Sequence, residues 1–216
     1  NGNKITIDVV IPLFKPNNSI KILINCLLLQ TFKINKIIII NSGASIKVNN
    51  FLNEVQNENN NIVIEKVYKL NPGTARNVGI NLSNANYIVF FDVNTFLELN
   101  WIKNNLNTLK SHSKVIIYGK RVTLANSFIK NINKWSTYGN TSYAALTGTI
   151  IERKYLIKHN LFFKNARAGE DIEWIQRAKD LDITDNINTS SIFYNGIFDN
   201  ILKSIYKWFI YSFAYA

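Results

Sequence analysis

The chain has 216 residues, of which 47% are hydrophobic and 18% charged, and it contains only 3 prolines. These values exclude a disordered chain, and the length suits one well-buried domain better than two. The formal net charge of +11 favours an anionic partner such as nucleotide phosphates, anionic lipid or nucleic acid. A single cysteine, Cys26, excludes a disulfide framework or a cysteine-rich metal site within one chain.

Five short apolar runs alternate with helix-length segments in the first 120 residues. Strands that are apolar throughout and separated by helical patterns predict a mostly parallel sheet covered on both faces. Apolar residues at helical spacing in segments 18–30 and 73–83 support the intervening helices. We therefore expect an α/β, Rossmann-like fold. The predicted strands are 5–12, 36–41, 61–67, 87–92 and 114–119.

The pattern becomes less regular between residues 119 and 140, and then a further apolar run (144–151) and a clear helix (170–181) follow. No linker, internal repeat or low-complexity segment divides the chain, so we expect a single domain over residues 1–216. The N-terminus enters a strand at once, without a signal-peptide pattern, and no apolar run reaches the roughly 18 residues of a membrane span. These features predict a cytoplasmic protein.

The C-terminal segment 203–216 mixes lysines with aromatic residues. This composition is compatible with an amphipathic helix at the inner face of a membrane, and packing of the same segment against the domain is an equal alternative. Nucleic acid is not an expected partner, because the basic residues are scattered and no nucleic-acid-binding motif is visible.

Small, polar and charged residues follow the predicted strands at their carboxyl ends. In a sheet of this kind ligands bind beyond those ends, so these residues form the candidate site. They are Pro12 and Phe14 after the first strand, Asn41 and Gly43 after the second, Arg76 in the loop after the third, and Asp92 and Asn94 after the fourth.

Asp92 and Asn94 are candidate metal ligands. Two residues apart on an extended segment, their side chains can point the same way, and hard oxygen ligands suit Mg²⁺ or Mn²⁺. The alternative is that Asp92 ends a strand and Asn94 forms a turn.

Arg76 lies after a Pro–Gly turn, in the first turns of a helix, where it can meet phosphate or a nucleobase edge; a solvated surface arginine is the alternative. The neighbouring Asn77 is expected to have a structural role, as a cap or as a bridge between loops, and not a catalytic one. Asn41 can hydrogen-bond a base, while Gly43 permits a tight turn close to a ligand, although a plain Asn-Ser-Gly turn explains the pair equally well.

Five segments taken together resemble the family-2 glycosyltransferases in their order and approximate spacing: IDVVIPLF, IIIINSGAS, NPGTARNVGI, YIVFFDVNT and AGEDIEWIQRA. The resemblance implies a GT-A fold and a metal-dependent, inverting transfer from a nucleotide-diphosphate sugar to a hydroxyl of a glycan or lipid-linked acceptor, in surface polysaccharide assembly. It also implies that residues up to about 120 bind the donor and that residues 121–216, including the C-terminal helix, bind the acceptor.

The resemblance assigns Asp171 as the general base and Glu170 as a residue that orients the acceptor or Asp171, although carboxylates opening a helix are also ordinary capping groups. It makes Pro12, Phe14, Asn41, Gly43, Arg76 and Asp92 donor contacts. Asn94 stands where the family has a second metal-binding acid, and Asn41 and Ser42 replace two further acids. A degenerate GT-A domain that binds a nucleotide sugar or a protein is therefore the alternative function.

Overall fold

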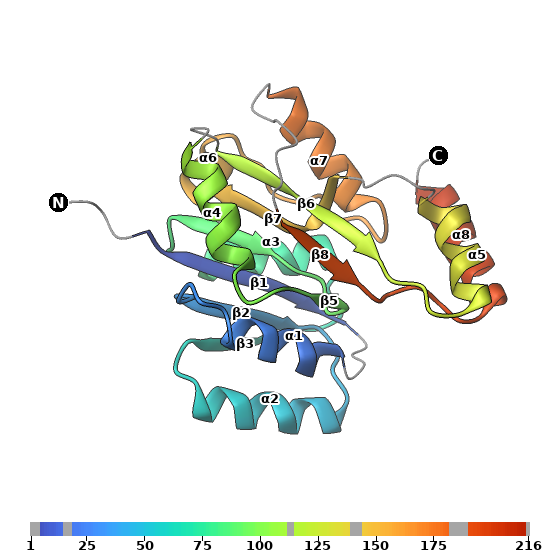
Figure 1. The fold of residues 1–216 in the computed structure, drawn as a ribbon, viewed down its shortest axis with the longest axis horizontal. Coiled ribbons are helices and arrows are strands. Elements are labelled where there is room, and N and C mark those ends of the chain that lie inside the picture. The colour runs from blue at the N-terminus through green and yellow to red at the C-terminus, as the bar shows by residue number, and fades with distance from the viewer. Residues whose placement is uncertain (1–4, 15–18, 112–114, 139–143, 182–189, 215–216) are drawn as a thin grey trace.

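The computed structural model describes residues 5–14, 19–111, 115–138, 144–181 and 190–214 (Figure 1). They build one eight-stranded sheet in the order β3-β2-β1-β4-β7-β6-β8-β5. The strands are β1 (Ile7–Leu13), β2 (Lys36–Asn41), β3 (Ile62–Lys66), β4 (Tyr87–Phe90), β5 (Thr95–Phe96), β6 (Ile116–Thr123), β7 (Ala144–Glu152) and β8 (Ser191–Tyr194). The helices are α1 (Ser19–Leu28), α2 (Ile46–Glu58), α3 (Pro72–Leu82), α4 (Trp101–Ser111), α5 (Phe128–Tyr138), α6 (Arg153–Lys158), α7 (Glu170–Asp180) and α8 (Ile201–Ala214).

The first four strands in the sheet order are parallel, as the alternation of apolar runs and helices predicts. Val9 of β1 lies in register with Ile37 of β2 on one side and with Val89 of β4 on the other. Beyond β4 the sheet is mixed, because β7 is antiparallel to both β4 and β6, while β6 and β8 are parallel. The predicted mostly parallel α/β fold is confirmed.

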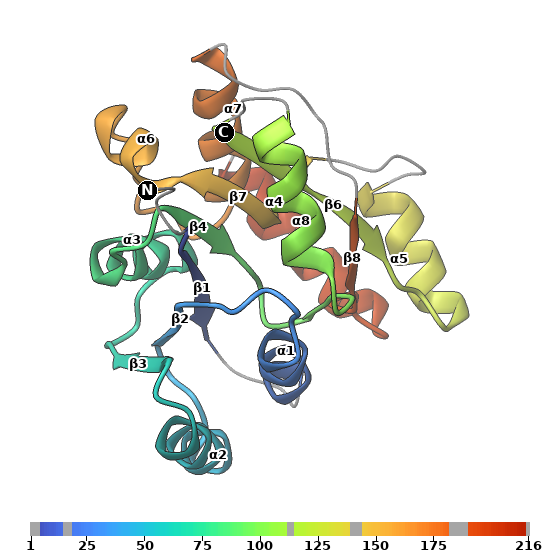
Figure 2. The same cartoon turned by 60° about the vertical axis from the view of Figure 1, so that its left-hand side comes forward.

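Helices cover both faces of the sheet (Figure 2), and each face has its own core. Successive side chains of a strand point to opposite faces, so Val9 and Ile11 join one core while Val10 between them joins the other. The first core also receives apolar residues of α1, α2 and α4, and the second receives those of α3, α6 and α7. The uninterrupted apolar strands therefore reflect burial on both faces.

Residues 119–138 are more regular than their sequence suggests. Strand β6 continues to Thr123 because its last residues pair with β8, from Lys120 opposite Ser191 to Thr123 opposite Tyr194. Gly119 allows this path, since a Cβ there would lie 1.8 Å from the carbonyl oxygen of Thr147. Strand β8 and Thr147 are distant in sequence from the end of β6, so the local sequence pattern does not predict this pairing.

The described part of the C-terminal segment forms α8, which lies beside α5 (Figure 1). The Asn133 amide of α5 donates to the carbonyl of Phe198 at 2.9 Å, and the Lys130 amine lies 3.6 Å from a carboxylate oxygen of Asp199. Within the described ranges, no helix has the length and apolar character needed to cross a bilayer.

Candidate active site

The loop after β2 is held by Asn41. Its side-chain oxygen accepts hydrogen bonds from the backbone N–H groups of Gly43 (3.3 Å) and Ala44 (2.9 Å), and its amide nitrogen donates to Asn49 at 2.6 Å. Asn41 is buried, so its amide organises the turn that leads into α2. Its contact with a base stays a prediction.

Phe14 and Gly43 lie close together at the same edge of the sheet, so an aromatic ring stands beside backbone that carries no side chain. Gly43 has a φ of 131°, and a Cβ there would lie 4.0 Å from two ring carbons of Phe14. Phe14 is exposed and follows directly on β1, in which Pro12 pairs with Ile40 of β2. The structure thus brings together Pro12, Phe14, Asn41 and Gly43.

Ser42, in the loop after β2, is hydrogen-bonded to the loop between β3 and α3. Its hydroxyl donates to the carbonyl of Leu70 at 3.1 Å and accepts the N–H of the same residue at 2.7 Å. Leu70 lies just before α3, so the hydroxyl fixes the start of the helix that presents Arg76. A serine where the family has an acid therefore has a structural role.

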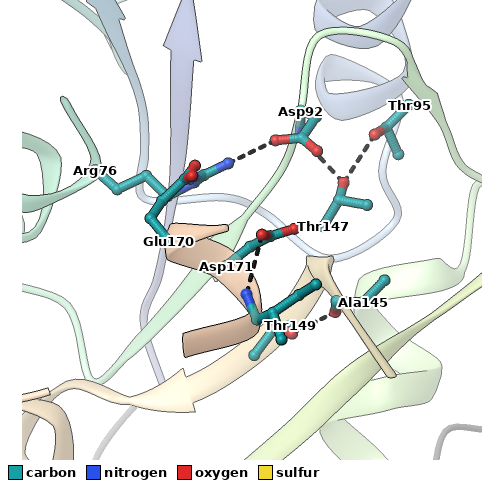
Figure 3. Close-up of polar contacts among 9 residues, drawn as sticks. Arg76, Asp92, Thr95, Ala145, Thr147, Thr149, Glu170 and Asp171 are labelled. Atoms are coloured by element: carbon teal, nitrogen blue, oxygen red, sulfur yellow. Dashed lines mark hydrogen bonds and ion pairs between the residues drawn. The ribbon is translucent and has the colours of Figure 1, made fainter. Parts of the chain in front are cut away.

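Arg76 is the centre of the candidate site (Figure 3). One guanidinium nitrogen lies 2.8 Å from the Asp92 carboxylate, and the other terminal nitrogen lies 3.1 Å from the Glu170 carboxylate. The side chains of Arg76, Asp92 and Glu170 are 5%, 35% and 9% exposed, which excludes the alternative of a solvated surface arginine, and the contact of Arg76 with a nucleotide stays a prediction. Arg76 joins the loop after β4 to the first turn of α7.

An aromatic wall supports the arginine from the side of α7. The guanidinium carbon lies 5.4 Å from the ring centroid of Phe163, which stacks on Trp174 at 5.3 Å. Asn77 holds the backbone of Phe163 by two hydrogen bonds of 2.8 Å, one donated and one accepted. The expected loop-bridging role of Asn77 is therefore confirmed, and it fixes the ring beside Arg76.

Asp92 lies in a turn, since its carbonyl accepts the N–H of Thr95 at 3.1 Å, so the expected extended segment through Asn94 is wrong. The N–H of Asp92 donates to the hydroxyl of Thr147 at 3.1 Å, and that hydroxyl lies 2.8 Å from the hydroxyl of Thr95 (Figure 3). Sequence reasoning missed Thr147. Its signal was a threonine inside a largely apolar run, a position that the strand buries.

Asn94 is half-buried in the same turn, and its carbonyl accepts the N–H of Asn195 at 3.0 Å. Across the described residues, no three His, Cys, Asp or Glu side chains gather as a metal-binding group. Asp92 and Asn94 offer hard oxygen atoms of the kind that Mg²⁺ and Mn²⁺ prefer, but one Asp92 oxygen already pairs with Arg76. Metal binding by Asp92 and Asn94 therefore stays a prediction.

The two carboxylates that open α7 differ in environment. Helix α7 follows Gly169, whose φ of 80° turns the chain into the helix. Glu170 is buried against Arg76, and burial raises its pKa above the ordinary range; Arg76 opposes this rise and the charge of Asp171 adds to it. Asp171 is half-buried and accepts the N–H of Ile172 at 2.9 Å. The more accessible carboxylate is the one predicted to act as base.

This α/β sheet has the fold of a glycosyltransferase, and at its carboxyl edge a buried arginine links a carboxylate of the loop after β4 to one in the first turn of α7. Residues 8–166 match the sequence model of Glycosyl transferase family 2, and the chain belongs to that family. It is 27% identical over 180 residues to an uncharacterized glycosyltransferase of Rickettsia bellii, covering 76% of this chain and 25% of that protein. It is 22% identical over 132 residues to glycosyltransferase GlyA of Streptococcus pneumoniae, covering 61% of this chain and 18% of that protein.

The chain therefore spans a quarter or less of the length of these relatives. Among solved structures, it resembles residues 1–349 of S. aureus TarS in complex with UDP-GlcNAc, with a TM-score of 0.69 and 15% identity over 93% of this chain and 61% of that one. A structure of TarS also matches, with a TM-score of 0.68 and 14% identity over 94% of this chain and 38% of that one. These similarities confirm the GT-A fold.

Proposed function

We propose that this chain is the catalytic domain of an inverting, metal-dependent glycosyltransferase. It moves a sugar from a nucleotide-diphosphate sugar to a hydroxyl of a glycan or lipid-linked acceptor, in surface polysaccharide assembly at the inner face of a membrane. The observation that supports this proposal is Arg76, which joins Asp92 on the donor side to Glu170 on α7 through two short ion pairs. This link holds the carboxylates of α7 beside the loop expected to bind the donor.

The donor would lie along the carboxyl ends of β1, β2 and β4, against Phe14, Gly43 and Asp92. Asp92 and Asn94 would hold Mg²⁺ or Mn²⁺, which neutralises charge on the departing nucleoside diphosphate. Arg76 would contact the nucleotide either directly or through the orientation of Asp92. We favour UDP among the nucleotides, because the TarS domain of the same fold was solved with UDP-GlcNAc.

Asp171 would act as general base on the acceptor hydroxyl. As the hydroxyl oxygen bonds to the anomeric carbon, its proton passes to the Asp171 carboxylate, and the bond from that carbon to the diphosphate breaks with its electron pair leaving on the phosphate. Attack from the face opposite the leaving group inverts the anomeric configuration in one step. Glu170, held by Arg76, would keep the first turn of α7 in place.

Calorimetric titration of UDP, GDP and dTDP, with Mn²⁺ and with a chelator, tests the donor site. We expect metal-dependent binding of one nucleotide that is lost in Asp92→Ala and retained in Glu54→Ala, which removes an exposed carboxylate from α2. Asp171→Asn should retain this binding but lower transfer by about 10²- to 10⁴-fold. Absence of nucleotide binding by the folded protein would favour a degenerate domain that binds a protein partner.

A further inference from the structure

Helices α5 and α8 lie side by side at one end of the molecule and expose apolar side chains that neither core uses (Figure 1). We name as the α5–α8 surface the exposed residues Phe128, Ile132, Trp135, Leu202, Ile205 and Phe209. Phe128 is 80% exposed and Leu202 is 72% exposed. Helices α1 and α2, by contrast, direct much of their apolar surface into a core.

The exposed residues form one stripe along each helix. Positions 128, 132 and 135 on α5, and 202, 205 and 209 on α8, recur at intervals of three or four residues, which places each set on one helix face. Exposed apolar stripes on two neighbouring helices indicate an interaction site, whereas single exposed apolar residues need no explanation.

The positive charge of α5 and α8 favours an anionic partner. Neither helix sequence contains an Asp or a Glu, and both contain lysines, of which Lys134 is half-buried and Lys203 exposed. The nearby Asp199 is paired with Lys130 of α5. Apolar and aromatic residues interleaved with basic residues match the boundary between lipid headgroups and acyl chains. A second copy would bring two chains of net charge +11 together, which their repulsion opposes.

The surface is also fixed relative to the candidate active site. The segment leading to α8 passes the Asp92–Asn94 turn, where the N–H of Asn195 donates to the Asn94 carbonyl at 3.0 Å. The end of β6, which leads to α5, pairs with the end of β8, with Thr123 opposite Tyr194. A partner bound to α5 and α8 would therefore lie at a fixed distance from the candidate active site.

We infer that the α5–α8 surface docks on an anionic lipid bilayer, with its apolar stripes at the headgroup boundary and Lys203 and Lys134 facing anionic headgroups. Both helices take part, so the docking surface is larger than the C-terminal segment alone. This inference does not depend on the transfer reaction.

Co-sedimentation with vesicles of phosphatidylcholine, with and without phosphatidylglycerol, tests the inference. We expect binding to the anionic vesicles, and a partition coefficient at least about tenfold lower for the double variant Phe128→Glu, Leu202→Glu, because two exposed apolar side chains that would enter the bilayer are replaced by charged ones. Ile46→Glu is the matched control. Ile46 is also 80% exposed and lies on α2, so this variant should bind like the wild type.

The basic component has its own test. Lys203→Gln should lower partition into anionic vesicles about fivefold and leave the weak binding to neutral vesicles unchanged. Circular dichroism melting of each variant verifies folding, and Trp135→Gln replaces the double variant if that one unfolds. Unchanged binding of the α5 and α8 variants, or equal loss with Ile46→Glu, would overturn the inference. So would a wild-type dimer in sedimentation equilibrium that Phe128→Glu dissociates, since that outcome assigns the surface to a second copy.

Discussion

At the scale of single residues, the site depends on one cation between two carboxylates. Arg76 pairs with Asp92 and with Glu170, and its burial makes each pair sensitive to the loss of a partner. The two carboxylates do not share the same environment, because Asp92 is partly open to solvent and Glu170 is not. This asymmetry suits Asp92 to ligand contact and Glu170 to positioning.

The pKa of Glu170 has a measurable consequence for stability. Burial raises it above the ordinary value of 4.5, so the folded protein holds this proton more tightly than the unfolded chain. The stabilisation that follows is fully present below pH 4.5 and is lost as pH rises through the folded-state pKa. We expect the free energy of unfolding of wild type, minus that of Glu170→Gln, to fall as pH rises from 4.5. Urea unfolding of both proteins at several pH values above 4.5 measures this difference in unfolding free energy. A difference that rises with pH would contradict a raised pKa of Glu170.

Thr147 is the second residue-scale test. Replacing it with Val leaves the N–H of Asp92 and the buried hydroxyl of Thr95 without this partner, so we expect a loss of about 1 to 3 kcal/mol in the free energy of unfolding. Metal-dependent nucleotide binding should weaken as well, because Asp92 loses its anchor. Thr147→Ser retains the hydroxyl and should stay close to wild type. Equal stability and binding in the Val and Ser variants would show that the hydroxyl does not position Asp92.

The sequence indicated which residues stand at the carboxyl edge but not their partners. Asp92 and Arg76 could be placed there, because each follows a predicted strand or turn. The pairing of Arg76 with Glu170 joins positions 94 residues apart, and no local pattern encodes it. For the same reason, Asn41 could be placed in a turn, but its bond to Asn49 could not be predicted. Local chemistry reveals a candidate residue, and tertiary packing decides what it touches.

At the scale of elements, the early strands and helices were predictable because their apolar runs are buried on both faces. The five runs expected as strands correspond to β1, β2, β3, β4 and β6. Strand direction could not be predicted in the same way, since β7 is buried along most of its length, as β1 is, yet runs antiparallel to its neighbours. An apolar run reports burial, whereas direction depends on the path of the intervening chain.

The packing of α3 on β1 provides a prediction at this scale. A Cβ at Gly79 would lie 2.4 Å from a methyl carbon of Val10, too close for either atom. Gly79→Ala gains about 1 kcal/mol of helix propensity, but we expect overpacking to cost more, within a range of about 1 to 3 kcal/mol, and to lower net stability. Val10→Ala removes the clashing methyl groups, so the double variant should lose less stability than the two single variants summed. Strict additivity in urea unfolding would show that the two residues do not compete for space.

At the scale of the whole molecule, strands from the first 120 residues and strands from the rest of the chain share one sheet. The ladder between β4 and β7 joins the four parallel strands to the mixed part of the sheet, which contains β5 from the early part of the chain as well as the later strands β7 and β8. Adjacent residues of β4 also face different cores, with Val89 in one and Phe90 in the other. Neither half could separate without exposing apolar strands, and this continuity argues for the predicted single domain.

The shared sheet predicts one cooperative unfolding transition. Trp101 is fully buried in one core and Trp174 in the other, so each reports on a different face of the sheet. With Trp135 and Trp208 replaced by Phe so that one tryptophan remains in each variant, Trp101→Phe and Trp174→Phe should show fluorescence midpoints in urea that coincide with the midpoint from far-ultraviolet circular dichroism. Coincidence follows because loss of either core removes the strands on which the other is packed. Two separated midpoints would instead mean that the faces unfold independently, and the chain would then have to be treated as two folding units despite its continuous sheet.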